Sequence, residues 1–222
     1  MKKNIVIIGC GSSLIYTIDI IEKQGLYNIV GLIDSIKDIG TELYGYKVIG
    51  RQEQIAKLIT QYNIEGGIIT IGTNYIREIV RKDIEKYVNN FEWINAIHPT
   101  AIIGSRVTLG KGLLIMANVT INPGTKMGDF CHCYTGAIIE HDNTFEDYSS
   151  ISANSCTGGY VKVDKYSAIC LSCTVFDRII IGTNVVVGSG SLVTKNLLDN
   201  GLYYGFPAKF IKERKLTDKY LK

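Results

Sequence analysis

The chain has 222 residues, which is long enough for one or two domains with a substantial hydrophobic core. Its 24 basic and 21 acidic side chains leave a formal net charge of only +3. The basic residues are scattered except near the C-terminus, so the composition argues against nucleic-acid binding.

The opening stretch MKKNIVIIGCG contains one apolar run, at residues 5–8. This run is too short for a membrane span or for the core of a signal peptide. We therefore expect a cytoplasmic protein with no membrane insertion. In that compartment the six cysteines are expected to be free thiols rather than a disulfide framework.

Residues 1–96 alternate short apolar strands with amphipathic helices. Strands are predicted at 4–9, 28–34, 66–72 and 91–97, and helices at 13–24, 51–62 and 74–88. In the first helix, Leu14, Ile15, Ile18 and Ile21 share the predicted buried face. Alternating strands and helices predict a small, parallel, Rossmann-like α/β domain over residues 1–96.

The loop GCGSS that follows the first predicted strand matches only part of the dinucleotide-binding pattern G-x-G-x-x-G. Gly9 and Gly11 fit, but Leu14 occupies the position of the third glycine. We therefore expect no NAD at this loop. The two glycines are also explained by a tight turn from strand to helix.

From residue 97 onward, an apolar residue recurs at every sixth position, and the one polar exception is Thr157. These positions are Ile97, Ile103, Leu109, Ile115, Ile121, Met127, Cys133, Ile139, Phe145, Ile151, Thr157, Val163, Ile169, Val175, Ile181, Val187 and Val193. A prism-shaped parallel β-helix has this period, with six residues on each of three sides. We therefore predict a β-helix with a C-terminal tail over residues 97–222. Spacing does not set its hand, although the general crossover rule favours a right-handed coil.

An unusual charged triplet, Glu140, His141 and Asp142, interrupts this pattern. Ile139 is a predicted inward position, so the triplet follows on a flank of the prism near a corner. A solvated polar strip is one explanation. The other is catalysis, because an imidazole can accept a proton at neutral pH and a neighbouring carboxylate can hold its tautomer.

The segment CHC suggests a metal site, but the register argues against one. Cys131 and Cys133 both occupy inward positions, where cysteine behaves as a small hydrophobic residue, while His132 points elsewhere. His98 begins the first predicted coil and is interpreted as a joint residue. We therefore expect no metal.

Several segments resemble a known family: IGSRVTLGKG, INPGTKMGDF, TGAIIEHD and the closing GLYYGFPAKFIKER. They are similar to hexapeptide-repeat acyltransferases, whose prism is left-handed. With an α/β domain in front, the chain resembles the PglD/NeuD/VioB-type nucleotide-sugar acetyltransferases over nearly its whole length. The resemblance implies acetyl-coenzyme A as donor, a nucleotide-linked amino sugar as acceptor, and a homotrimer.

The resemblance also implies which residues are functional. His141 matches the general base, and Asp142 matches the residue that supports it, which is usually Glu in the family; Glu140 is the alternative partner. The matching donor positions are Ser150, Gly159, Leu171 and Ser189, although the family often has His at the first and Gly at the last. The matching nucleotide-sugar positions are Gly11, Ser12, Ser13, Asp34, Ser35 and Gly72.

The expected function is acetyl-coenzyme A-dependent N-acetylation of a dTDP- or UDP-linked 4-amino-4,6-dideoxy sugar, by direct attack on the thioester. The expected role is in lipopolysaccharide O-antigen or other glycan precursor biosynthesis. A sialic-acid-type sugar O-acetyltransferase is the alternative. A hexapeptide-repeat carbonic anhydrase needs three suitably spaced histidines, and a β-helix scaffold leaves the triplet and the α/β domain unexplained.

Overall fold

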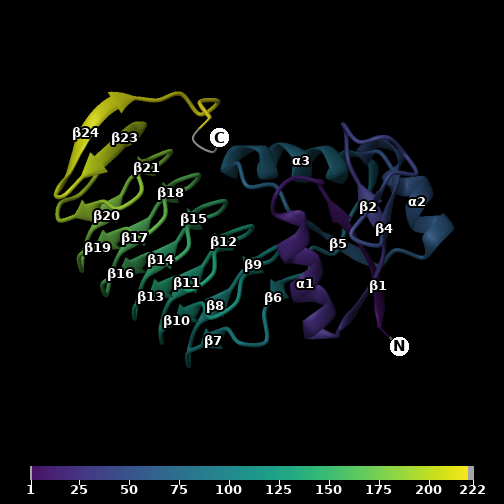
Figure 1. The fold of residues 1–222 in the computed structure, drawn as a ribbon, viewed down its shortest axis with the longest axis horizontal. Coiled ribbons are helices and arrows are strands. Elements are labelled where there is room, and N and C mark those ends of the chain that lie inside the picture. The colour runs from purple at the N-terminus through teal and green to yellow at the C-terminus, as the bar shows by residue number, and fades with distance from the viewer. Residues whose placement is uncertain (1, 220–222) are drawn as a thin grey trace.

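The first unit of the fold is a five-stranded sheet with the order β3-β4-β2-β1-β5, seen at the right of Figure 1. The computed structural model describes residues 2–219. The strands are β1 (Lys3–Ile8), β2 (Tyr27–Ile33), β3 (Glu42–Leu43), β4 (Tyr46–Gly50) and β5 (Gly66–Ile69). All neighbours are parallel except β3 and β4, so the predicted Rossmann-like sheet is confirmed.

The helices of this unit are α1 (Leu14–Gln24), η1 (Gln52–Gln54), α2 (Ile55–Tyr62) and α3 (Asn74–Tyr87). All three predicted helices are therefore present. The predicted buried face of α1 is wrong at one position, because Ile15 is 45% exposed whereas Ile20 is buried. The stripe that meets the sheet is rotated slightly from the one the periodicity suggested.

Two local features differ from the sequence expectations. The hairpin of β3 and β4 was not predicted; it turns at Tyr44 and Gly45, both of which have positive φ as a tight hairpin turn requires. The predicted strand at 91–97 is broken into a single bridge from Trp93 to Gly67 and the strand β6 (Ala96–Ile97). The predicted domain boundary falls inside β6.

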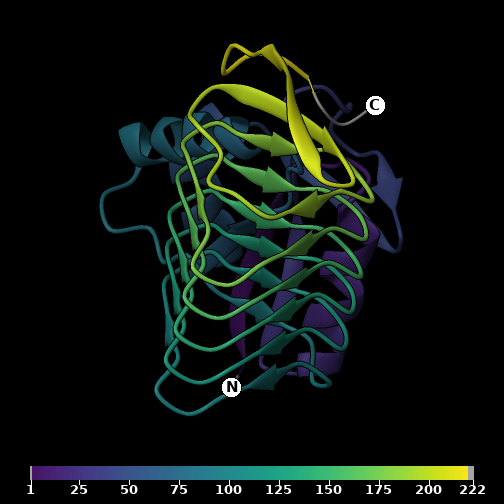
Figure 2. The same cartoon turned by 90° about the vertical axis from the view of Figure 1, so that its left-hand side faces the viewer.

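The second unit is a three-sided prism of short parallel strands, stacked along one axis in Figure 2. Side 1 contains β7 (Ile102–Ile103), β10 (Thr120–Ile121), β13 (Ile138–Ile139), β16 (Cys156–Thr157), β19 (Thr174–Val175) and β22 (Leu192–Val193). Side 2 contains β8 (Thr108–Leu109), β11 (Lys126–Met127), β14 (Thr144–Phe145), β17 (Lys162–Val163) and β20 (Ile180–Ile181). Side 3 contains β6, β9 (Leu114–Ile115), β12 (His132–Cys133), β15 (Ser150–Ile151), β18 (Ala168–Ile169), β21 (Val186–Val187), β23 (Gly201–Gly205) and β24 (Ala208–Glu213).

The six-residue register is confirmed by both pairing and burial. Ile121 pairs with Ile139, one coil further along, and Ile139 pairs with Thr157. From Ile115 to Val193 every predicted inward position is buried, and these side chains form one continuous core. The coil is a left-handed parallel β-helix, as the family resemblance implied, and not the right-handed coil that the general crossover rule favours.

From residue 106 to residue 190, every corner of the prism places one residue in the left-handed backbone region. These residues are Arg106, Gly112, Asn118, Gly124, Phe130, Gly136, Asp142, Tyr148, Asn154, Tyr160, Tyr166, Ser172, Arg178, Asn184 and Gly190. Glycine, asparagine and aspartate tolerate this conformation, whereas bulky residues are strained in it. A bulky residue at a corner is therefore strained.

Side 3 of the prism and the corner between sides 2 and 3 pack against the α/β unit (Figure 1). Leu114 and Met116 join the core on one face of its sheet. Phe130 and Tyr148 join the core on the other face. The two units therefore share hydrophobic cores, which fixes the α/β loops relative to the prism.

The far end of the prism is closed by the antiparallel hairpin of β23 and β24. Its first strand continues side 3 by pairing with β21. Across residues 2–219, none of the helices combines the length and the apolar character that a membrane crossing requires.

The register predicts opposite outcomes for two neighbouring residues of β20. Ile181 is fully buried in the prism, whereas Ile180 is 45% exposed and stands beside Lys162. Ile181→Asp should lower the free energy of unfolding by about 3–5 kcal/mol, because it buries an unpaired carboxylate. Ile180→Asp should change it by less than about 1 kcal/mol. Denaturant unfolding measures both, and equal losses would contradict the register.

Candidate active site

His141 and Asp142 lie at the corner between sides 1 and 2, directly after β13. Their side chains are 51% and 46% exposed, so the expected position outside the prism core is confirmed. Asp142 is the corner residue itself, with φ of 56°, a conformation that aspartate tolerates well. The corner turns both side chains outward.

The structure assigns Asp142 rather than Glu140 as the partner of the histidine. His141 Nδ1 lies 2.9 Å from Asp142 Oδ2. An ionised carboxylate only accepts hydrogen bonds, so the proton of a neutral ring sits on Nδ1. The Nε2 atom then carries the free lone pair, which is the arrangement that a general base needs.

Gly159, a predicted donor-site residue, lies against the same imidazole. A Cβ atom at this position would lie 2.7 Å from His141 Nε2 and 2.8 Å from Cε1. Any side chain here would therefore displace the ring. Gly124 has the same relation to the carboxylate, because its Cβ would lie 2.4 Å from Asp142 Oδ1. The glycines one coil to either side leave room for the pair.

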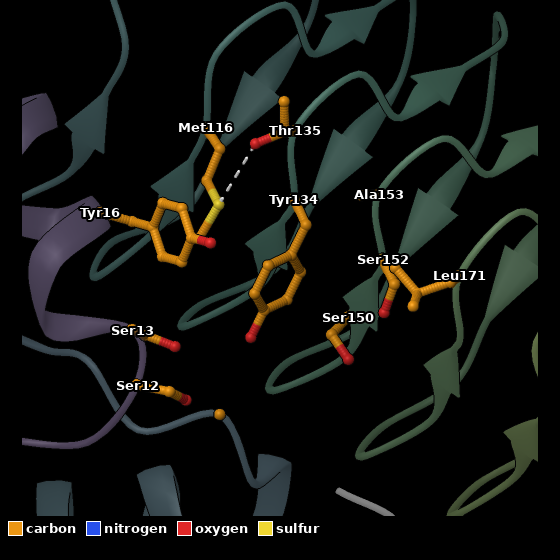
Figure 3. A pocket seen from close by; sticks show the side chains of 11 residues that line it. Ser12, Ser13, Tyr16, Met116, Tyr134, Thr135, Ser150, Ser152, Ala153 and Leu171 are labelled. Atoms are coloured by element: carbon orange, nitrogen blue, oxygen red, sulfur yellow. Dashed lines mark hydrogen bonds between the residues drawn. The ribbon is translucent and has the colours of Figure 1, made fainter.

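A cavity of about 390 Å³ lies between the α/β unit and side 3 of the prism (Figure 3). It brings together five of the residues predicted for the two substrates: Ser12, Ser13, Gly72, Ser150 and Leu171. No motif in the sequence pointed to the other lining residues, which are Tyr16, Met116, Tyr134, Thr135, Ser152 and Ala153.

The lining of this cavity suits a flat, polar ligand. Tyr16 from α1 and Tyr134 from the prism project into it from its two walls (Figure 3). Burial raises the pKa of Tyr134, so its hydroxyl stays protonated at neutral pH and can donate a hydrogen bond. The serines add small hydroxyl groups on both walls, while the phenol rings offer surfaces for stacking.

Three predicted nucleotide-sugar residues do not line this cavity. Gly11 precedes it on an exposed turn, and Ser35 is exposed. Asp34 accepts hydrogen bonds from the backbone amides of Cys10 (2.6 Å), Ile36 (2.8 Å) and Lys37 (2.8 Å). Burial opposes its ionisation, but these amide hydrogen bonds outweigh burial and lower the pKa of Asp34. Asp34 therefore organises the two loops beside the cavity.

Ser189, the last predicted donor-site residue, lies in a different cavity of about 280 Å³. Lys212 and Arg214 from the C-terminal segment line it as well. Within one chain, the four predicted donor positions thus fall at three places: Ser150 and Leu171 in the first cavity, Gly159 at the histidine, and Ser189 here.

The first cavity and His141 lie on different parts of one prism. The cavity reaches the corner between sides 3 and 1, whereas His141 lies at the corner between sides 1 and 2. One full side of six residues separates these corners, a span of roughly 20 Å at about 3.3 Å per residue. The cavity and the histidine of the same chain therefore do not face each other.

Arg77 of α3 is a site-forming residue that the sequence analysis missed. It is fully buried, and its Nη1 atom donates to the carbonyls of Ile71 and Gly72, both at 3.1 Å. Its Nη2 atom donates to Tyr148 and Ser149 at 3.2 Å. The guanidinium thus ties the loop at Gly72 to the coil that leads into Ser150, on opposite walls of the cavity. The available signal was a charge on the apolar stripe that α3 presents at Val80 and Ile84.

Two other polar residues join the units rather than contacting the cavity. Asn74 donates to the carbonyls of Tyr166 and Ser167, both at 3.0 Å. His98 is buried; its Nδ1 atom lies 2.8 Å from the Thr100 hydroxyl, and its Nε2 atom lies 4.0 Å from the carboxylate of Asp19 in α1. The interpretation of His98 as a joint residue agrees with this position.

The CHC segment has the inward cysteines that the register predicted. Cys131 and Cys133 are buried in the prism core, and His132 points to the other face, where it is fully buried beneath the α/β unit. Among residues 2–219, no cluster of three or more His, Cys, Asp and Glu side chains has the arrangement of a metal site.

Residues 4–84 match the family model described as the PglD N-terminal domain. A similar solved structure is a histidine-to-alanine variant of GDP-perosamine N-acetyltransferase from Caulobacter crescentus in complex with CoA and GDP-perosamine. It has 26% identity and a TM-score of 0.88, over 95% of this chain and 97% of that chain. The family model covers the N-terminal part of the chain, and the expected resemblance to the PglD/NeuD type is confirmed to that extent. The predicted class of enzyme, an acyltransferase, is confirmed with it.

Two further relatives are more distant or shorter in their match. The acetyltransferase domain of PglB from Neisseria gonorrhoeae has 20% identity and a TM-score of 0.83 over 95% of this chain and all of that chain, a likeness that bears on the fold alone. A Schizosaccharomyces pombe protein named as a serine acetyltransferase is 31% identical over 115 residues, or 47% of this chain. The chain matches only 43% of that protein's length.

His132 should make the protein sensitive to acid. Burial, followed by the positive charge of Arg77, holds the pKa of His132 well below its ordinary value of 6.5. The unfolded chain therefore binds this proton first, so stability falls as pH drops below about 6.5. His132→Phe should flatten the fall in melting temperature between pH 7.5 and 5.5. Parallel curves for the two proteins would contradict this assignment.

Proposed function

We propose that the protein is an acetyl-coenzyme A-dependent N-acetyltransferase that acts on the amine of a nucleotide-linked 4-amino-4,6-dideoxy sugar. The observation that carries this proposal is the His141–Asp142 pair, which presents a free Nε2 at an outer corner of the prism. Acetyl-coenzyme A as the donor agrees with the CoA bound in the similar enzyme from Caulobacter crescentus.

The chemistry requires one base and no covalent enzyme intermediate. The amine nitrogen attacks the thioester carbonyl, and His141 Nε2 takes the proton that the nitrogen sheds. Asp142 stabilises the imidazolium that forms, through the Nδ1 hydrogen bond. The tetrahedral oxyanion then collapses, the carbon–sulfur bond breaks, and the CoA thiolate leaves and is protonated. The products are the acetamido sugar and CoA.

The acceptor is proposed to place its nucleotide in the cavity between the units. Supporting this, the cavity joins the GCGSS loop to two tyrosines, and GDP-perosamine is bound by the similar enzyme. The sequence favoured dTDP or UDP, whereas that relative binds a guanine nucleotide. Two similar structures of that enzyme carry alanine or asparagine in place of a histidine, while CoA and GDP-perosamine are bound.

We further propose that the complete site forms between the subunits of a homotrimer. A cavity and a histidine on different corners of one prism can meet when prisms pack side by side around a three-fold axis. Residues Ser150 and Leu171 of one subunit would then lie opposite His141 of the next. The cytoplasmic location and the role in surface-polysaccharide precursor synthesis are proposed on the same family basis.

The acceptor is tested by following thiol release from acetyl-coenzyme A with a panel of nucleotide sugars. We expect release with a dTDP- or UDP-linked 4-amino-4,6-dideoxy sugar, and none with the matching 4-hydroxy sugars, because an uncharged amine is a stronger nucleophile than a hydroxyl group. GDP-perosamine belongs in the panel. Turnover with hydroxyl acceptors alone would replace the proposal with the O-acetyltransferase alternative.

His141→Asn should lower kcat by roughly 10²–10⁴-fold, the usual contribution of a general base. The KM for acetyl-coenzyme A should change little, because the base meets the acceptor amine. Asp142→Asn should give a smaller loss, and asparagine suits the left-handed corner, so folding is retained. Glu140→Gln is the matched control and should retain activity. A folded His141→Asn enzyme with wild-type turnover would contradict the assignment.

Two inactive variants should restore each other if the site is shared between subunits. Ser12→Trp fills the cavity from an exposed loop, and His141→Asn removes the base. Each should be inactive alone. In trimers refolded together from equal amounts, about a quarter of the sites combine an intact cavity with an intact histidine. Recovery of roughly that share of wild-type activity is expected, whereas inactive mixed trimers would place the whole site within one chain.

A further inference from the structure

Tyr160 stands one coil beyond Asp142 and packs against the imidazole of His141. The two rings meet edge to face, with centroids 5.2 Å apart and planes at 86°. The backbone amide of Tyr160 also donates to the carbonyl of His141 at 3.1 Å. The aromatic ring is therefore fixed to the same segment of chain that carries the base.

Arg178, at the next corner along the same edge, holds the tyrosine in turn. Its guanidinium carbon lies 4.7 Å from the centroid of the Tyr160 ring, a cation–π distance. Its backbone amide donates to Gly159 at 2.9 Å. His141, Tyr160 and Arg178 thus form a continuous stack along the outer corner between sides 1 and 2.

The backbone of Tyr160 is strained in the conformation that places its ring against His141. Its φ is +59°, in the left-handed region that disfavours a bulky residue. Tyr148 and Tyr166 have the same backbone conformation, but both pack with the α/β core. Tyr160 is 49% exposed, so burial in the α/β core does not offset the strain of its backbone. Strained residues persist where the surroundings require them, often at functional sites.

We propose that Tyr160 is a positioning residue that orients the His141 ring for proton removal, an inference that rests on the proposed function. Three constraints then act on one imidazole. Asp142 holds Nδ1 at 2.9 Å, Tyr160 fixes the plane of the ring, and Gly159 leaves the space that Nε2 occupies. Arg178 acts through Tyr160 by keeping its ring in place. The position of Nε2, the atom that must meet the acceptor amine, is thereby fixed.

The test compares three variants of the stack in the assembled enzyme. Tyr160→Phe keeps the ring and should have nearly wild-type kcat. Tyr160→Asn removes the ring while relieving the backbone, since asparagine already occupies corners 118, 154 and 184. It should melt no lower than wild type, lower kcat by roughly 10–100-fold and leave both KM values unchanged. Arg178→Gln should give a smaller fall in kcat.

A spectroscopic measurement tests whether the Tyr160 ring lies against His141 in solution. The imidazole Cε1–H signal of His141, assigned by its loss in His141→Asn, lies in the ring current of Tyr160. It should shift in Tyr160→Asn and stay in place in Tyr160→Phe. His98 provides an internal reference, because it lies at the joint between the units and should not shift.

Each result decides the inference. A fall in kcat with the Cε1–H shift supports it. A rise in either KM at constant kcat would instead make Tyr160 a substrate contact and overturn it. Unchanged turnover in Tyr160→Asn, with turnover lost in His141→Asn, overturns this inference alone. Unchanged turnover in both variants overturns the proposed function as well.

Discussion

The buried guanidinium of Arg77 is the interaction on which the rest of the structure depends. Arginine keeps its proton in proteins, and a buried charge is tolerated only when it is fully hydrogen-bonded. Here five backbone carbonyls surround it, from the loop at Ile71 and Gly72 and from the coils at Phe130, Tyr148 and Ser149. Each carbonyl is held in place because the buried guanidinium needs it as a hydrogen-bond acceptor. The α/β loop and the prism are thus fixed relative to each other. They form the two walls of the cavity, and Arg77 holds these walls at a constant separation.

The prism imposes a second constraint, which explains where functional side chains can stand. The inward positions of the six-residue register are apolar with the exception of Thr157, so a polar functional side chain stands at an outward strand position or at a corner. Each corner requires a left-handed residue. Asp142 satisfies that requirement without strain, whereas Tyr160 does not. The same geometry that presents the carboxylate to His141 also places a strained aromatic ring against the histidine.

The division of the site follows from these two constraints together. The α/β unit covers side 3 and can therefore form a cavity only there, while the His141 corner stays uncovered by it. Binding surface and base are thus separated on one chain by a prism side. Side-by-side packing of prisms is the arrangement proposed to reunite them. In this arrangement one subunit would bind the acceptor and the next subunit would deprotonate it, and neither rigid prism would need to move far.

The sequence by itself determined the period-six register, and with it the buried state of Ile139 and the outward position of His141. That was possible because in a β-helix the environment of a residue depends on a local repeat. The sequence also placed Ser12, Ser13 and Gly72 in one site through the family motifs. Only the tertiary structure decided that Asp142 and not Glu140 meets the imidazole, since the left-handed corner sets that direction. It also decided the exposure of Ile15, the burial of Arg77 and the contact between Tyr160 and His141. These depend on chain segments that are far apart in sequence or on the packing of two units, and no local pattern encodes such contacts.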